Sequence, residues 1–387
     1  MVNGFSKWPE AAGCGDGTAA IAGELLRRGA SRLSALDSQN LANLVNGFCK
    51  WPERTGCGAA TVAIAKEVLR RGGDALSDFT PQGLANLVNG FSKWADATGC
   101  GAATLAVAGE IRRRAGRADR LANFTHQHLA NLVNAFSKWP GQENSRLATV
   151  AIADEVRRLG NRLSGFASRD LANLVNGFSK WPADLGCGQA TVAIACEIYR
   201  RADRLSDFAP QALANLVNGF GKWPGQASCG SATVAIAGEV VGRGGLSAFA
   251  HQHLANLVNG FSKWPDQANC REATLAIAGE VLRRRASRLS GFDSQELANL
   301  VQGFSKWPDE AACGDVTVAI AGEMLRRGDR ADKLSAFNPQ DLAHLANGFS
   351  KWPKQAGCVA AAVALAGEVR RRADALSVLT RRIWRTW

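Results

Sequence analysis

Along residues 76–116 the apolar positions follow two helical patterns in succession. The first pattern places apolar side chains at i, i+3, i+4, i+7 and i+10, which is the spacing of one face of an α-helix. Its members are Leu84, Leu87, Val88, Phe91 and Trp94. Thr80 and Pro81 predict the start of this helix, because Thr is a good N-cap and Pro is tolerated at the first helical position. We call it helix A and expect its apolar stripe to lie in the core.

The second pattern, here called helix B, is small and apolar nearly all round. It starts near a cysteine and ends in arginines, as in residues 60–71. In most copies Pro follows the tryptophan of helix A and the next segment carries Gly, which predicts a short loop between the helices. The Leu-Ser-x-Phe segment after helix B, for example 205–208, is either one more helical turn or a third helix.

The helix pair recurs about nine times along the chain. Each copy is marked by the tryptophan of helix A, with spacings of 41 to 45 residues, at Trp8, Trp51, Trp94, Trp139, Trp181, Trp223, Trp264, Trp307 and Trp352. A lone pair cannot bury its apolar face, so successive copies must stack into a solenoid with an extended concave surface. We therefore predict an all-α fold, an α-solenoid of helix-pair repeats with a period of about 43 residues.

The two ends of the chain depart from the repeat. Met1 begins halfway along a helix A, so we expect a fragment of a longer array. Residues 1–379 are predicted to form one continuous solenoid, and residues 380–387 match no part of the repeat.

Helix A also carries a polar stripe at i, i+4, i+7 and i+11, whose members face the same way. Stacking turns each position into a row. The first asparagine row is Asn43, Asn86, Asn131, Asn173, Asn215, Asn256 and Asn299, with His344 in the last copy. The second asparagine row is Asn3, Asn46, Asn89, Asn134, Asn176, Asn218, Asn259 and Asn347, with Gln302 as its one substitute. The lysine row is Lys7, Lys50, Lys93, Lys138, Lys180, Lys222, Lys263, Lys306 and Lys351.

The members of these three rows between residues 43 and 306 are the candidate partner-binding residues. Asn is a poor residue for a helix interior because its side chain competes for backbone hydrogen bonds, so its repetition calls for an explanation. One explanation is internal bonding between copies. The other is a groove in which amides bond a ligand backbone or base edges while lysines neutralise charge.

One position beside the polar stripe varies freely from copy to copy. Its residues are Asn40, Gly83, His128, Asp170, Ala212, His253, Glu296 and Asp341. Proteins that read one RNA base per repeat combine residues that are constant in every repeat with a residue that varies and contacts the base. The residues at this position are therefore specificity candidates. The alternative is plain solvent exposure near a helix start.

The formal net charge is +12, which favours anionic partners. Arginine runs that close helix B are candidates for phosphate binding or for local pairing with a Glu four residues earlier, which also suits a helix C-terminus. Eight of the ten cysteines sit six residues after the repeat tryptophan, and we expect them to be buried free thiols in a reducing compartment. The tryptophans are expected to be core, with base stacking as the alternative.

The sequence shows no pattern of an enzyme. The five histidines have no metal spacing, and we find no catalytic triad, phosphate loop or paired carboxylates. We therefore predict a non-catalytic protein without metal, cofactor or small-molecule substrate. No apolar run approaches the ~20 residues of a membrane span and no signal peptide is visible, so no membrane partner is expected.

The repeated Ser-Lys-Trp-Pro, as in residues 6–9, 137–140, 179–182, 262–265, 305–308 and 350–353, resembles the SKWP repeat proteins. These are type III secreted effectors of plant-pathogenic bacteria such as Ralstonia and Xanthomonas. The resemblance covers residues 1 to about 379 and implies a HEAT/armadillo-like solenoid, secretion into a host plant cell and a role in virulence. Cys49 and Gly221 replace the Ser, and Ala95 replaces the Pro. A second likeness, over 208–217 and its equivalents, is to octotricopeptide-type RNA-binding repeats.

Two functions follow from these patterns. The first is binding of single-stranded RNA, suggested by the charge, the unbroken lysine row and the variable position. The second is a scaffold for an acidic host protein or peptide.

Overall fold

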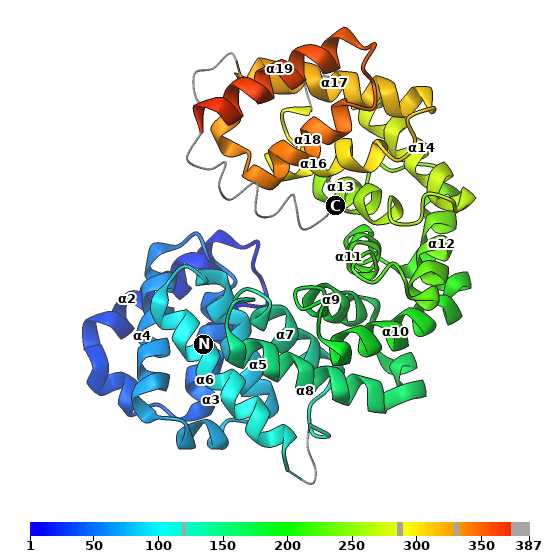
Figure 1. Cartoon of the computed structure of the whole chain (residues 1–387). Coiled ribbons are helices and arrows are strands. Elements are labelled where there is room, and N and C mark those ends of the chain that lie inside the picture. The colour runs from blue at the N-terminus through cyan, green and yellow to red at the C-terminus, as the bar shows by residue number, and fades with distance from the viewer. Residues whose placement is uncertain (118–120, 285–288, 329–332, 373–387) are drawn as a thin grey trace. The chain divides into compact units, whose positions relative to one another are not determined.

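The computed structural model describes residues 1–117, 121–284, 289–328 and 333–372, and these residues form α-helices joined by turns and short 3₁₀ helices (Figure 1). The chain divides into two compact units, Met1–Glu197 and Ile198–Trp387, called unit 1 and unit 2. Helices pack on their neighbours in the repeated order, as in an α-solenoid, which confirms the all-α prediction. Residues 380–387 lie outside the described residues.

Each predicted helix A is an α-helix whose last residue is the repeat phenylalanine. In unit 1 these helices are α1 (Val2–Phe5), α3 (Ser38–Phe48), α5 (Pro81–Phe91), α7 (His126–Phe136) and α9 (Ser168–Phe178). In unit 2 they are α11 (Pro210–Phe220), α13 (His251–Phe261), α16 (Ser294–Phe304) and α18 (Pro339–Phe349).

Each predicted helix B is a longer α-helix. In unit 1 these are α2 (Ala12–Ser34), α4 (Thr55–Arg71), α6 (Thr98–Ala115) and α8 (Glu143–Leu159); α10 (Leu185–Arg200) contains the boundary between the units. In unit 2 they are α12 (Ala227–Gly242), α14 (Ala268–Arg283), α17 (Ala311–Gly328) and α19 (Ala356–Arg371). Among the described residues, the segment after helix B is a 3₁₀ helix in four copies: η1 (Asp74–Asp78), η3 (Gly160–Gly165), η4 (Ala202–Asp207) and η5 (Lys333–Ala336). A further 3₁₀ helix, η2 (Ser92–Trp94), follows the helix A α5.

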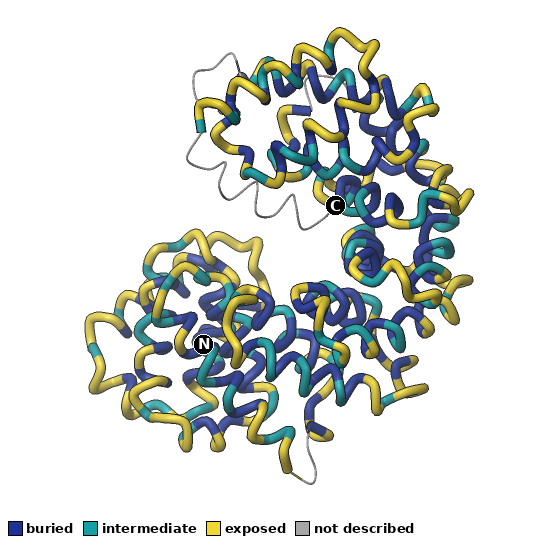
Figure 2. Tube along the Cα trace, viewed as in Figure 1, coloured by how far each residue is buried: buried dark blue, intermediate teal, exposed yellow. Residues whose placement is uncertain are grey.

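Within each unit the A helices pack on A helices and the B helices on B helices, which produces two layers. The core lies between and within these layers (Figure 2). Leu84, Leu87, Val88 and Phe91 of α5 are completely buried, so this part of the predicted apolar stripe is confirmed.

The prediction that the tryptophan belongs to the stripe of helix A is wrong in detail. α5 ends at Phe91, and Trp94 closes the 3₁₀ turn η2. The indoles lie against the preceding copy instead: Trp51 is buried and its Nε1 donates to the carbonyl of Pro9 at 3.2 Å. A Cβ on Gly15 would lie 2.8 Å from that nitrogen, so glycine makes room for the ring.

A second close approach joins neighbouring A helices. A Cβ on Gly260 of α13 would lie 2.7 Å from the carbonyl oxygen of Val217 in α11, well inside contact distance. Gly303 and Gly348 stand in the same relation to Val258 and Val301, and Ala135 takes this place in α7. Glycine thus sets the short spacing of the A layer and brings the residues after each helix A close together.

We predict opposite effects for two Gly→Ala substitutions in unit 2. Gly260→Ala should lower the free energy of unfolding by about 1–3 kcal/mol, because its methyl group overpacks the contact with α11. Gly279→Ala in α14, where a Cβ meets no atom within 4 Å, should raise it by up to ~1 kcal/mol, because Ala is the better helix former. Urea unfolding followed by circular dichroism measures both. A stabilising Gly260→Ala would contradict the close approach.

The arginine runs are largely structural. Glu67 in α4 is buried and accepts hydrogen bonds from Arg70 and Arg71, which lower its pKa to about 2. Arg71 also donates to the carbonyl oxygens of Leu33 and Leu36 in the preceding copy, each at 2.8 Å. We call this arrangement the arginine clamp. It recurs with Arg114, Arg243, Arg284, Arg327 and Arg372.

The cysteine row is buried, as predicted. Cys14 is half-buried, and the other seven members are buried: Cys57, Cys100, Cys187, Cys229, Cys270, Cys313 and Cys358. Burial raises the pKa of the Cys100 thiol to about 11 and that of Cys313 to about 12. These thiols therefore stay protonated at neutral pH, which suits a packing role.

Candidate nucleic-acid interface

The polar stripe of helix A is positioned by the way the helix begins. In α5 the Thr80 side chain accepts a hydrogen bond from the backbone N–H of Gly83 at 3.1 Å, so Thr80 is the N-cap that the sequence predicts. With the apolar stripe buried, Gln82 and Lys93 remain exposed and Asn86 and Asn89 are half-buried. Gln82 and Lys93 are eleven residues apart, which at ~1.5 Å rise per residue makes the polar face about 16 Å long.

The first asparagine row is half-exposed and unbonded. All seven asparagines of this row are half-buried: Asn43, Asn86, Asn131 and Asn173 in unit 1, and Asn215, Asn256 and Asn299 in unit 2. Within the described residues none of these amides forms a side-chain hydrogen bond of its own. Each one keeps both a donor and an acceptor available to a ligand or to water.

The second asparagine row behaves differently. Asn259 donates to the Oδ1 of Asn218 at 3.1 Å, and Asn347 donates to the Oε1 of Gln302 at 3.3 Å. In unit 1, Asn46 donates to Asn3 at 3.4 Å. These contacts join neighbouring copies, so the internal ladder that the sequence left as one alternative exists in this row at these three places. The sequence alone gave no reason to distinguish the two asparagine rows.

The lysine row is exposed in every copy. Six of these lysines form no ion pair within the described residues: Lys50, Lys93, Lys138, Lys222, Lys263 and Lys306. The arginines of helix B, in contrast, pair repeatedly with Glu. Nine of the twelve lysines lie in this row, and the 34 arginines equal the 34 acidic residues in number. The lysine row therefore carries nine positive charges, in a chain whose formal net charge is +12.

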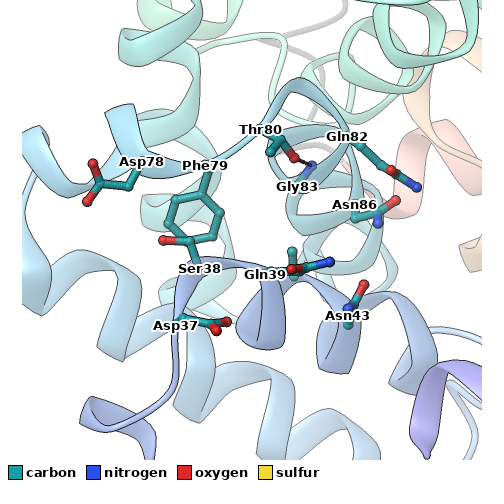
Figure 3. Close-up of a pocket in the computed structure, with 11 residues that line it drawn as sticks. Asp37, Ser38, Gln39, Asn43, Asp78, Phe79, Thr80, Gln82, Gly83 and Asn86 are labelled. Carbon is teal, nitrogen blue, oxygen red and sulfur yellow. Dashed lines mark hydrogen bonds between the residues drawn. The ribbon is translucent and has the colours of Figure 1, made fainter.

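The opposite end of the polar face opens into a hollow of about 450 Å³ between α3 and α5 (Figure 3). Gln39, Asn43, Gln82 and Asn86 line it, so the structure brings together polar-stripe residues of two copies. Asp37, Ser38, Asp78 and Phe79 also line it and were missed by the sequence reasoning. They belong to the turn before each helix A and the start of the helix, where only the stacking of copies shows which residues meet.

The variable position is mostly not a solvent-exposed one. Four of its residues are buried, namely Gly83, Asp170, Ala212 and Asp341, so the alternative of plain solvent exposure is wrong for them. Asn40 is exposed. In four copies the side chain caps its own helix by accepting the N-cap N–H. These are His128 (3.2 Å), His253 (3.1 Å), Glu296 (2.9 Å) and Asp341 (3.0 Å). The position therefore has a structural use that the capping pattern Asp293-x-x-Glu296 could have revealed.

Tryptophan stacking on a ligand gains no support from this geometry, because the indoles of Trp51, Trp181, Trp307 and Trp352 are buried and bond backbone carbonyls. No helix among the described residues combines the length and apolar character needed to cross a bilayer. The same residues contain no group of three His, Cys, Asp or Glu side chains arranged to hold a metal ion.

Comparison with known proteins does not add a family to this description. No protein-family model matches the chain, and no curated protein sequence does.

Proposed function

We propose that this chain is a non-catalytic α-solenoid protein that binds single-stranded RNA along the polar face of its A helices. In this proposal about nine HEAT/armadillo-like helix pairs, with a period of about 43 residues, present the same face repeatedly. The observation that carries it is the presence of two sets of polar side chains without partners among the described residues. They are the first-row amides, which form no side-chain hydrogen bond, and six lysines that form no ion pair: Lys50, Lys93, Lys138, Lys222, Lys263 and Lys306.

The two ends of the polar face suit different parts of a nucleotide. The lysine end favours phosphates, because ammonium groups neutralise the backbone charge. The hollow between α3 and α5 carries the carboxylates of Asp37 and Asp78, whose charge disfavours phosphate and suits hydrogen bonds from base amino groups. A single strand would therefore run with its backbone along the lysines and its bases toward the asparagines.

An acidic peptide is the second candidate, and the same lysine row favours it. Free amides along a groove can also bond an extended peptide backbone. The observation on this side is that the indoles of Trp51, Trp181, Trp307 and Trp352 are buried, since stacking supplies much of the affinity of many single-strand binders. The SKWP resemblance implies action inside a host plant cell, which is compatible with both candidate functions. The protonated thiols suit such a reducing compartment.

The test is the salt dependence of binding to a labelled mixed-sequence RNA oligonucleotide. The logarithm of the binding constant should fall linearly with the logarithm of salt concentration, with a slope of about −0.7 for each phosphate neutralised. Replacing Lys50, Lys93 and Lys138 together with Gln should make that slope shallower by about 2. Lys66→Gln, on the exposed strip of α4, is the matched control and should leave it unchanged.

Two outcomes oppose the proposal. No binding of RNA at low salt would end it. Binding of a poly-glutamate peptide under conditions where RNA is not retained would favour the acidic-peptide function instead.

A further inference from the structure

Three lysines from successive copies lie close together in unit 2. A Cβ on Gly221, the residue after α11, would lie 3.2 Å from the Cγ of Lys263, so the alkyl chain of Lys263 lies directly against Gly221 and beside Lys222. Lys263 is exposed, like the rest of the lysine row. Partial desolvation by the protein packed against its side chain, together with the charges of Lys222 and Lys306, lowers the pKa of Lys263.

Gly221 is specific to this copy. Every other copy has Ser or Cys at its position, and in those copies the Ser side chain donates to the carbonyl three residues earlier, as Ser92 does to Asn89 at 2.8 Å. A Ser side chain at position 221 would crowd Lys263. The absence of a side chain therefore lets two lysines of neighbouring copies lie next to each other.

His344 is the fourth member of this group. It replaces the first-row asparagine in α18, and its Nδ1 is buried without a hydrogen-bond partner within the described residues. Burial, with the charges of Lys263 and Lys222, lowers its pKa. On the adjacent helix α16 the nearby row residue, Gln302, is neutral and bonds Asn347.

Crowding of like charges without a carboxylate costs free energy that a bound anion would recover. Lys222, Lys263 and Lys306 form no ion pair within the described residues, and ammonium and imidazole N–H groups both donate to phosphate oxygens. We propose that Lys222, Lys263, Lys306 and His344 form a phosphate-binding cluster in unit 2. The inference rests on the proposed function in one respect, namely that the phosphates belong to single-stranded RNA.

The first arm of the test compares single lysine variants of the full chain in RNA binding. Lys263→Gln should weaken binding at least tenfold. Lys93→Gln is the control in unit 1: Lys93 is equally exposed but has Cys49 rather than Gly at the equivalent position of the preceding copy, and its loss should weaken binding two- to threefold. Gly221→Ser keeps every charge but displaces Lys263, and it should reproduce most of the Lys263→Gln loss. Equal losses for Lys263→Gln and Lys93→Gln would overturn the cluster and leave RNA binding intact.

The second arm uses inorganic tripolyphosphate and does not depend on RNA. Tripolyphosphate should raise the pKa of His344 measured by NMR, with His344→Asn identifying the signal, and Lys263→Gln should abolish the change. If tripolyphosphate acts in this way while RNA does not bind, the cluster stands and the phosphates come from a source other than RNA. If tripolyphosphate leaves His344 unchanged, the cluster is wrong, whatever RNA does.

Discussion

Replacing Asn215, Asn256 and Asn299 together with alanine should weaken RNA binding about 100-fold without destabilising the protein. These first-row amides have no hydrogen-bond partner in the described residues, so their removal breaks no internal hydrogen bond. A hydrogen bond contributes about 0.5–1.5 kcal/mol, so three lost bonds to RNA correspond to roughly 2–4 kcal/mol. Ala is also a better helix former than Asn, so the free energy of unfolding should stay equal or rise. Fluorescence anisotropy and urea unfolding measure the two effects.

The control for this variant is a second-row pair in the same helices. Asn218 and Asn259 bond each other at 3.1 Å, so replacing both with alanine removes an internal contact rather than two free amides. We expect that double variant to bind RNA within a few-fold of the parent chain. If the two variants lose binding equally, the distinction between the rows has no functional meaning. If the first-row variant loses stability instead of binding, its amides are structural.

Arg71→Met should lower the free energy of unfolding by about 3 kcal/mol. Arg71 is only 17% exposed, and its loss leaves Glu67 with one fewer cation and removes the guanidinium donor from the Leu33 and Leu36 carbonyls. Hydrogen bonds that involve a charged group contribute about 1.5–3 kcal/mol, and the buried Glu67 carboxylate, left with Arg70 as its one partner among the described residues, adds to the cost. The urea midpoint and hydrogen exchange of the α4 amides measure this loss.

Arg28→Met is the matched control in the same unit. Arg28 pairs with Glu24 four residues earlier, as Arg71 does with Glu67, but it is 52% exposed and bonds no carbonyl of another copy within the described part of the chain. An exposed ion pair contributes at most ~1 kcal/mol, so we expect a change within about 0.5 kcal/mol. Similar losses for Arg28→Met and Arg71→Met would contradict the clamp. Leu159 occupies the clamp position after Glu155 in α8, so the repeat tolerates one unclamped copy.

Local signals in the sequence were sufficient to locate the helices. Thr80 and Pro81 begin α5 as predicted, because capping and proline geometry depend on neighbouring residues alone. The end of the helix was placed too late, at Trp94 rather than Phe91, because the indole belongs to a contact with the preceding copy. Spacing along one helix cannot reveal such a contact.

The candidate site was predictable in composition but not in chemistry. The rows of Asn and Lys follow from the repeat, whereas the hydrogen-bond state of each row does not. Asn218 and Asn215 lie one helical turn apart on the same face, yet only Asn218 meets an amide of the next copy. The arginines illustrate the same limit, since Arg70 and Arg71 are adjacent in sequence and only Arg71 reaches the carbonyls of the preceding copy.

By itself the sequence determined that this protein is helical, that its helices come in repeated pairs, and that amides and lysines share one face of helix A. These properties depend on periodicity and on residues within a few positions of one another. The tertiary structure alone decided which amides are free, which arginines are structural, and that Lys263 lies beside Lys222. The reason is physical: these contacts join residues some 35 to 45 positions apart, and their distances depend on how closely glycine allows two helices to pack.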